Sequence, residues 1–410
     1  MRATWLILIV TILGCSEGTA TVAPRFAVLD DVGEGTWADV TAGRDYTCAL
    51  DTSGAAFCWG SNQFGQLGTQ RSDTLCGPKE SSYICMRAPA RVETTQRFRA
   101  LSAGSVHTCG ITQNGEAYCW GANSNGQLGD LSRGGPSLVR IPTTLSWVQI
   151  AAGETHTCAI RGDAALFCWG SNDRGQIGNG NLSGIVGVTR VQLPGAIASV
   201  SAGQQRTCAR LTSGAVYCWG AVWFKREQGL EFTQAQPSPR LVPQSPAMTR
   251  LSVGTLTTCG TDASGFGYCW EANPRGEMGT GDTEGSTTPR RIASNLELLQ
   301  ISAGLVQTCA IAVSGIGYCW GDDSFGQLGT SPFGLAERCG GLQFHCSTVP
   351  VPVYGRQQFT AISTGPGSHA CGVSTRGNLY CWGLGVSGQR GDGTTVTGIA
   401  LPIKVTEPIS

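Results

Sequence analysis

The chain has 410 residues, with 28 basic and 28 acidic side chains and therefore a formal charge of zero. Such a balance gives no overall attraction to nucleic acid or to an anionic membrane surface, so we expect neither as a partner. The 19 cysteines would be unusual in a reducing cytosol and indicate an oxidising compartment.

The first 14 residues have the features of an export signal. Arg2 supplies a basic start, and the apolar run from Trp5 to Leu13 is too short to span a bilayer. The residues Ile-Leu-Gly-Cys that end at Cys15 resemble a bacterial lipobox, in which the cysteine is lipidated and becomes the mature N-terminus. We therefore expect a signal peptide over 1–14, a lipid on Cys15, a tether that leads into the folded part over 15–36, and an outer-membrane or cell-surface location. The alternative is a secreted or periplasmic protein cleaved further on, after Ala20.

From residue 37 onwards the chain consists of repeats. The segment "YTCALDTSGAAFCWGSNQFGQLG", which begins at Tyr46, returns in seven copies whose first cysteines are 49 to 51 residues apart, except for two steps of 61 and 62. Copy four replaces Gly-Gln-Leu-Gly by "AVWFKREQGLEF", and copy five has Glu271 where the other copies have glycine after tryptophan. The two long steps indicate insertions, at 69–88 and 330–349.

Each copy predicts four short strands. An apolar segment ending in Ala-Gly or a close variant precedes two strands joined by a tight turn, and in most copies a last strand follows a proline. Four strands in about 50 residues, without helical periodicity, are typical of one β-propeller blade. The sequence therefore predicts an all-β fold, a single seven-bladed propeller of four-stranded blades over 37–410.

The cysteines are spaced for disulfides within blades. In every copy two cysteines lie ten residues apart, and this even separation around a central turn places both on one sheet face, opposite each other. Cysteines paired in separate blades cannot gather around a metal, so we expect no metal site and no cofactor. Each insertion adds one more pair, and only Cys15 is left over. The predicted pairs are Cys48–Cys58, Cys76–Cys85, Cys109–Cys119, Cys158–Cys168, Cys208–Cys218, Cys259–Cys269, Cys309–Cys319, Cys339–Cys346 and Cys371–Cys381.

The repeat resembles that of the regulator of chromosome condensation family. The resemblance rests on the Ala-Gly strand, the His-Thr pair, the glycine turn, Trp-Gly, Asn and Gly-Gln-Leu-Gly, and it covers residues 37 to about 405. It implies a seven-bladed propeller, in agreement with the count of copies. The cysteines stand where that family more often has apolar strand residues, and its members have unrelated functions, so the resemblance does not define a ligand.

Three sets of repeat positions could carry chemistry. His107, His156 and His369 share a position that accepts other residues in the remaining copies, so we expect hydrogen bonding at a blade edge rather than catalysis in the central channel. We expect the acidic pair Asp322 and Asp323 to form a solvated turn, with a calcium or catalytic site as the alternative. The repeat tryptophans should be core between blades: Trp59, Trp120, Trp169, Trp219, Trp270, Trp320 and Trp382.

Departures from the repeat are better candidates for binding, because loops carry recognition while periodic positions build blades. The candidates are Trp223, Phe224 and Arg226 in copy four, and Phe333, Phe344 and His345 in the second insertion, together with the first insertion. We expect both insertions on one propeller face. These features favour a non-enzymatic, surface-anchored, monomeric protein that holds a protein or glycan partner. The alternative is a hydrolase or lyase with a site in the central channel.

The lipid anchor can be tested by changing Cys15→Ser. We expect the variant to fold normally, because the tether lies outside the repeats, and to leave the membrane fraction for the soluble fraction. Fractionation with mass spectrometry of the mature N-terminus measures both effects. A variant that stays in the membrane fraction, with wild-type protein that carries no lipid, would contradict the lipobox interpretation.

Overall fold

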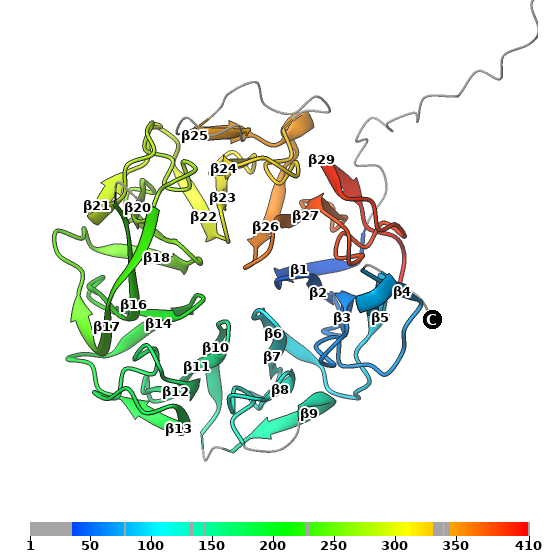
Figure 1. Ribbon diagram of the computed structural model, residues 1–410, viewed down its shortest axis with the longest axis horizontal. Helices are drawn as coiled ribbons and strands as arrows, with labels where there is room; N and C mark the ends of the chain where they lie inside the picture. The colour runs from blue at the N-terminus through cyan, green and yellow to red at the C-terminus, as the bar shows by residue number, and fades with distance from the viewer. Residues whose placement is uncertain are drawn as a thin grey trace, which may run out of the picture. The chain divides into compact units, whose positions relative to one another are not determined.

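The computed structural model describes residues 35–77, 79–130, 134–142, 145–226, 229–330, 339 and 345–408. These residues form seven antiparallel sheets arranged as blades around a central axis (Figure 1). Within the described ranges, no helix has the length and apolar character needed to cross a membrane. The predicted all-β, seven-bladed propeller is confirmed. The predicted signal peptide, Cys15 and most of the tether lie outside the described residues.

Every blade is built from one contiguous stretch of chain, with its strands ordered from the axis outwards. Blades one to three consist of β1 (Trp37–Ala42), β2 (Tyr46–Asp51), β3 (Ala56–Ser61), β5 (Tyr83–Arg91) and the added β4 (Thr74–Cys76); β6 (Phe98–Ala103), β7 (His107–Thr112), β8 (Ala117–Gly121) and β9 (Gly135–Ile141); β10 (Trp147–Ala152), β11 (His156–Arg161), β12 (Leu166–Ser171) and β13 (Ile185–Val191). Blades four and five consist of β14 (Ile197–Ala202), β15 (Arg206–Leu211), β16 (Val216–Arg226) and β17 (Gly229–Leu241); β18 (Met248–Val253), β19 (Thr257–Asp262), β20 (Gly267–Glu271) and β21 (Ser286–Arg291). Blades six and seven consist of β22 (Leu298–Ala303), β23 (Gln307–Ala312), β24 (Gly317–Asp322) and β25 (Cys346–Pro352); β26 (Phe359–Thr364), β27 (His369–Ser374), β28 (Leu379–Leu384) and β29 (Gly398–Lys404). Two single-turn 3₁₀ helices, η1 (Lys79–Ser81) and η2 (Tyr354–Arg356), lie in connections.

The ring closes without a strand shared between the two ends of the chain. The innermost strand of blade one, β1, packs directly against β26 and β27 of blade seven, while β29 lies at the outer edge of blade seven (Figure 1). The Trp37 amide donates to the Gly377 carbonyl at 3.0 Å, and the Ala42 amide donates to Ser363 Oγ at 3.0 Å. Closure therefore depends on the same kind of side-by-side blade packing as the rest of the ring.

Disulfides link the second and third strands of every blade. In each repeat pair the two cysteines are direct cross-strand partners, as in Cys48 opposite Cys58, and their Cα atoms are 4.0 to 4.1 Å apart. This is the close type of antiparallel pair, in which side chains approach most nearly. The structure also joins Cys76 to Cys85 and Cys339 to Cys346, with Cα separations of 6.0 and 5.9 Å.

Between blades, one peptide carbonyl is the recurring contact. The carbonyl of Gln66, in the loop after the third strand of blade one, accepts from Thr108 Oγ1 at 2.9 Å and from Trp120 Nε1 at 3.0 Å, both in blade two. Equivalent carbonyls receive the tryptophan of the next blade at six of the seven interfaces, at 2.8 to 3.0 Å: Gln66, Gln127, Gln176, Glu277, Gln327 and Gln389. All seven repeat tryptophans are buried, as predicted.

The residue after that carbonyl places an apolar side chain between the blades. Leu67, Leu128, Ile177, Met278 and Leu328 are fully buried in five of these interfaces. The following glycine lets the loop approach closely, since a Cβ on Gly68 would lie 2.7 Å from Val92 Cγ1 and 2.9 Å from Trp120 Nε1. The Gly-Gln-Leu-Gly element is therefore the part of each blade that joins it to the next.

The interface between blades four and five is different. Blade four continues from β16 into β17 as a long two-stranded ribbon and has no equivalent of the Gly-Gln-Leu-Gly loop. Trp270 of blade five is buried, yet its Nε1 has no hydrogen-bond acceptor among the described residues.

The histidines extend the interblade contacts. The Nε2 atoms of His107, His156 and His369 lie 2.8 to 2.9 Å from the threonine hydroxyl of the following blade, and each hydroxyl in turn donates to the loop carbonyl. Because the hydroxyl proton goes to the carbonyl, the imidazole Nε2–H is the donor to the hydroxyl. Burial lowers the pKa of His107 and His369 to about 3 and that of His156 to about 4, so these rings are neutral. The expected role in hydrogen bonding at a blade edge is thus seen in the structure.

The carbonyl contact can be measured by comparing two equivalent tryptophans. Trp120→Phe removes a buried hydrogen bond, whereas Trp270→Phe removes an indole that has none, so the first should lower the free energy of unfolding by about 1 kcal/mol more than the second. Denaturant titration followed by circular dichroism checks this difference, with Trp169→Phe expected to match Trp120→Phe. Equal losses at all three positions would contradict the assignment.

The buried histidines predict a specific pH dependence. Between pH 6.5 and about 4, unfolded His156 binds a proton that the folded protein excludes, so its contribution to stability is present above pH 6.5 and is lost as the pH falls. His156→Gln, which copies the residue of blade six, removes this titration. The difference in unfolding free energy between wild type and variant should shrink by about 1.4 kcal/mol for each pH unit from pH 6 to 5. If the unfolding free energies of wild type and variant changed in parallel between pH 6 and 5, the assignment of a buried, neutral His156 would be contradicted.

Candidate partner-binding face

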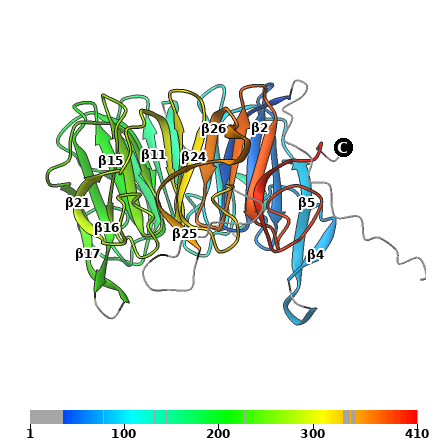
Figure 2. The same cartoon turned by 90° about the horizontal axis from the view of Figure 1, so that it is seen from above.

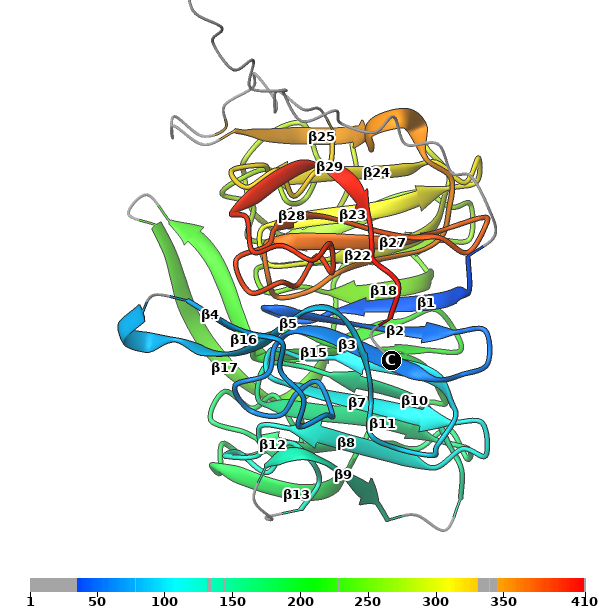
Figure 3. The ribbon, with the colours of Figure 1, turned by 90° about the vertical axis from the view of Figure 1, so that its right-hand side faces the viewer.

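The insertions project from one face of the propeller. The loops after the first and third strands of each blade define this loop face, and both the β4–β5 ribbon and the β16–β17 ribbon extend beyond it on the same side (Figures 2 and 3). The Cys339–Cys346 bond holds the start of β25, where Cys346 pairs with Asp322 at the loop-face end of β24. The described parts of both insertions are therefore on the expected common face.

The first insertion forms a stapled arm, residues 71–87. Its strands pair Leu75 with Ile84, and alternation along each strand turns Cys76 and Cys85 inwards and these two aliphatic residues outwards. Cys76 and Cys85 are buried, whereas Leu75 is 64% exposed and Ile84 is 40% exposed. The arm thus presents a cross-strand pair of apolar side chains to solvent on a ribbon held by a disulfide.

The arm is also attached to the neighbouring blade. Tyr83 Oη lies 2.6 Å from Ser387 Oγ of blade seven, and the Gly393 amide donates to the Arg87 carbonyl at 3.0 Å. Arg87 pairs with Asp73 at the base of the arm, where Nε and Oδ2 are 3.4 Å apart. These contacts hold the arm at both its base and its flank, which reduces the entropy that a partner would have to remove on binding.

A groove of about 620 Å³ lies between the arm and blade two. Ile84 of the arm, Phe64 of the adjacent loop, and Val106 and Pro136 of blade two line it. Phe64 is 45% exposed. The arm and this groove together place three exposed apolar side chains close to one another on the loop face.

The other predicted binding residues are described only in part. Trp223, Phe224 and Arg226 belong to strand β16, but their side chains are outside the described part of the structure. Phe333 and Phe344 lie outside the described residues altogether. His345 is exposed, and its carbonyl accepts the Asp323 amide at 2.7 Å. These residues therefore remain candidates for partner binding only because they depart from the repeat sequence. Sequence reasoning did not single out Leu75, Ile84 and Phe64, although alternation around the insertion's cysteines could have indicated the first two.

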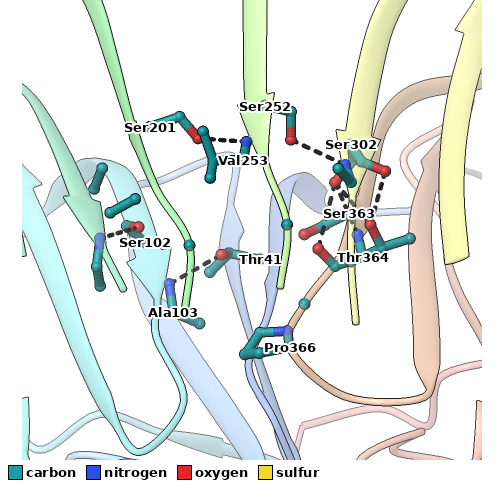
Figure 4. A pocket seen from close by; sticks show the side chains of 18 of the residues that line it. Thr41, Ser102, Ala103, Ser201, Ser252, Val253, Ser302, Ser363, Thr364 and Pro366 are labelled. Atoms are coloured by element: carbon teal, nitrogen blue, oxygen red, sulfur yellow. Dashed lines mark hydrogen bonds between the residues drawn. The ribbon is translucent and has the colours of Figure 1, made fainter. Parts of the chain in front are cut away.

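The central channel is a cavity of about 350 Å³ lined by the innermost strands (Figure 4). Six of its hydroxyl groups join neighbouring blades. Each accepts the backbone amide of the next blade at 2.9 to 3.0 Å, as Thr41 does from Ala103 and Ser302 does from Thr364. Where Ala151 lacks a hydroxyl, Gln149 makes the equivalent bridge to Val200 at 3.0 Å. The wall is therefore largely structural.

One ionisable side chain, Glu154, is among the residues that line the channel. It lies where the inner strand of blade three ends on the loop face, and its Oε1 is 2.8 Å from Arg44 Nη2 of blade one. His107 and His156 do not line the channel but are buried between blades, so the alternative of histidines facing the channel is wrong for these two residues. Within the described ranges, no group of three or more His, Cys, Asp and Glu side chains is arranged to hold a metal ion.

The acidic pair of blade six is not a solvated turn. Asp322 and Asp323 are both buried, because their loop folds between blades. Asp323 takes the place of the repeat asparagine and accepts the Leu328 amide at 2.9 Å, as Asn62 accepts that of Leu67 at 3.1 Å. Asp322 accepts from Gln327 Nε2 at 2.7 Å and pairs with Arg275 at 3.1 Å.

A third buried acid, which the sequence did not single out, lies nearby. Glu277 replaces the glutamine of Gly-Gln-Leu-Gly in blade five, and burial, with the charge of Asp322 adding to it, raises its pKa to about 8. Its Oε2 accepts the Arg275 amide at 2.8 Å, the contact that Gln66 makes with Phe64. This carboxyl group is buried and accepts a hydrogen bond within its own loop, so its role is to stabilise the loop, and it does not form part of a solvent-accessible site.

The propeller resembles solved structures over nearly its whole length. Human WBSCR16 superposes with a TM-score of 0.71 at 20% identity, covering 86% of this chain and 94% of that chain. Prp20p from Saccharomyces cerevisiae, whose structure was reported with its binding properties to Gsp1p and histones, has a TM-score of 0.72 at 19% identity and covers 87% of each chain. At such identities these similarities establish the fold alone.

Sequence comparison places the repeats more specifically. A segment of 93 residues is 34% identical to the human E3 ubiquitin-protein ligase HERC2, covering 22% of this chain and 2% of the ligase. Another of 103 residues is 29% identical to the Ultraviolet-B receptor UVR8 of Arabidopsis thaliana, covering 24% of this chain and 21% of the receptor. The chain thus matches less than a quarter of the length of either relative.

Residues 12–304 match the RCC1-like domain, and residues 359–389 match the regulator of chromosome condensation (RCC1) repeat. Because the first match covers more than half of the chain, this protein belongs to the RCC1-like domain family.

Proposed function

We propose that this chain is an exported, lipid-anchored binding protein without enzymatic activity, which uses its loop face to hold a partner as a monomer. The observation that supports this most directly is the stapled arm. A disulfide and contacts with blade seven restrain it, yet its outward side carries the exposed pair Leu75 and Ile84. Apolar side chains that are rigidly held and left exposed are typical of interaction surfaces.

The chemistry of the arm favours a protein over a glycan as the partner. Leu75 and Ile84 are aliphatic, and Phe64 is the aromatic side chain of the adjacent groove. Aliphatic surface is stabilised by burial against other apolar side chains, which proteins provide and most sugars do not.

The family and the cysteines are in keeping with this proposal. Prp20p, which has the same fold, has binding properties to Gsp1p and histones, so the propeller supports protein binding in at least that relative. Nine disulfides suit an oxidising compartment outside the cytosol. We therefore expect the partner of this chain to be another protein of the envelope or the cell exterior.

The arm can be tested with the double variant Leu75→Ser and Ile84→Ser. Both side chains are exposed, so thermal stability should change little, while capture of the partner from native envelope should fall at least tenfold because the apolar contact is lost. Quantitative mass spectrometry of captured proteins provides the measurement.

A matched control replaces two similarly exposed aliphatic residues near the opposite face, Leu299→Ser with Val313→Ser. This control should capture the same partner as wild type. The proposal is wrong if the arm variant captures normally and the control does not.

A further inference from the structure

The interface between blades four and five contains a cavity at the position where the other blades insert a side chain beside the repeat tryptophan, and we call this position the slot. At five interfaces the chain inserts a buried Leu, Ile or Met side chain from one blade against the tryptophan of the next, and at a sixth Arg390 takes that place. Among the side chains that the structure describes, blade four inserts none of this kind, because its chain continues outwards along β16 and β17. A cavity of about 300 Å³ remains there, lined among others by Val222, Val242 and Trp270.

The walls of this cavity correspond to those of the filled slots. Leu67 packs in a cluster with Val92 and Trp120, and the equivalents of those two residues at the slot between blades four and five are Val242 and Trp270. The volume is well above the roughly 150 Å³ that admits a benzene molecule, so it can hold a leucine-sized side chain together with part of its backbone.

The slot also contains a hydrogen-bond donor, the indole N–H of Trp270, for which the described residues provide no acceptor. Trp270 is 1% exposed, and its Nε1 has no hydrogen-bond partner among the described residues. The other six repeat tryptophans donate from the same atom to a peptide carbonyl at 2.8 to 3.0 Å. A buried donor without an acceptor is unfavourable, and a carbonyl brought in by a ligand would remove that cost.

Two further departures from the repeat occur at the same place. Glu271 has a φ of +89°, where the other six copies use glycine at +91° to +109°, so its backbone is strained. Its Oε2 accepts from Thr258 Oγ1 at 2.8 Å, which replaces the missing loop carbonyl for the threonine but not for the tryptophan. Its Oε1 lies 2.5 Å from Nη2 of Arg206, the residue that blade four has at the repeat position of His107.

This ion pair determines the charge of the acceptable ligand. Arg206 and Glu271 both line the cavity and are paired with each other, so neither is left to bind a ligand ion, and the third charged residue of the lining, Arg240, is exposed to solvent. An uncharged group with an apolar side chain and a carbonyl acceptor fits best.

We propose that the slot between blades four and five binds a loop of a partner protein, which inserts a Leu, Ile or Met side chain and presents the preceding peptide carbonyl to Trp270 Nε1. The occupant follows from the molecule itself, since five of the other slots hold such a segment of this chain. The proposal rests on the binding function above but assigns a site separate from the stapled arm. Val222 of β16 and Gln236 of β17 line the slot, and the β16–β17 ribbon extends from there beyond the loop face (Figure 3), so it would flank the incoming loop.

The test uses a peptide copied from this chain. Acetylated and amidated Phe-Gly-Gln-Leu-Gly-Thr, the sequence of residues 64–69, is titrated into the oxidised full-length protein labelled with ¹⁵N-tryptophan. One indole N–H resonance, identified as that of Trp270 by its absence in Trp270→Phe, should shift in a saturable manner at millimolar peptide. The resonance of Trp120, identified with Trp120→Phe, should not move.

Two controls separate specific insertion from general association. A peptide with alanine in place of leucine should bind more than about tenfold more weakly, because the apolar side chain supplies most of the contact. Val242→Phe should fill the slot and abolish the shift while the other indole resonances keep their positions.

An unmoved Trp270 resonance at millimolar peptide, or an equal shift with the alanine peptide, would overturn the proposal. The arm variant Leu75→Ser with Ile84→Ser should bind the peptide as wild type does. Failure of the slot is thereby distinguished from failure of the arm.

Discussion

Five of the seven blade interfaces depend on one hydrogen-bonding arrangement, a peptide carbonyl of one blade shared by the threonine hydroxyl and the tryptophan indole of the next. Disulfides act inside blades and cannot hold two blades together. At the interface of blades one and two, the Gln66 carbonyl receives both Thr108 and Trp120, and Leu67 fills the space beside them. A buried carbonyl has two acceptor positions, so one loop satisfies both donors without water.

The disulfides support this arrangement from within each blade. Thr108 and Trp120 are cross-strand partners, and the next pair along the same two strands is Cys109 and Cys119. The bond between the cysteines fixes the spacing and register of the two strands immediately beside the two donors. The cysteine pairs and the tryptophan–threonine pairs therefore form one unit, in which a covalent link positions the groups that make the noncovalent contact between blades.

The sequence predicted what depends on contacts within one repeat. The strands follow from alternation and turn residues, and the cysteine pairs follow from a spacing that places Cys48 opposite Cys58. It did not predict the burial of Asp322 and Asp323, because a polar turn between strands usually faces solvent. Their loop folds between blades, and that is decided by the neighbouring blade. The asparagine that recurs before Gly-Gln-Leu-Gly was the signal that this turn has a fixed structural role.

The same limit applies more strongly to the slot. The loss of Gly-Gln-Leu-Gly from copy four can be read directly, but a missing loop does not establish a cavity, since neighbouring side chains often close such a gap. Arg206 and Glu271 lie 65 positions apart in the chain and depart from the repeat separately, yet they meet in one ion pair at this interface. Glu271 accepts the hydrogen bond from Thr258 in place of the missing carbonyl, whereas the Trp270 indole has no acceptor among the described residues. A repeat protein thus gains a distinctive site by omitting a contact that its other copies make, and the chemistry of the site is defined by the contact that was omitted.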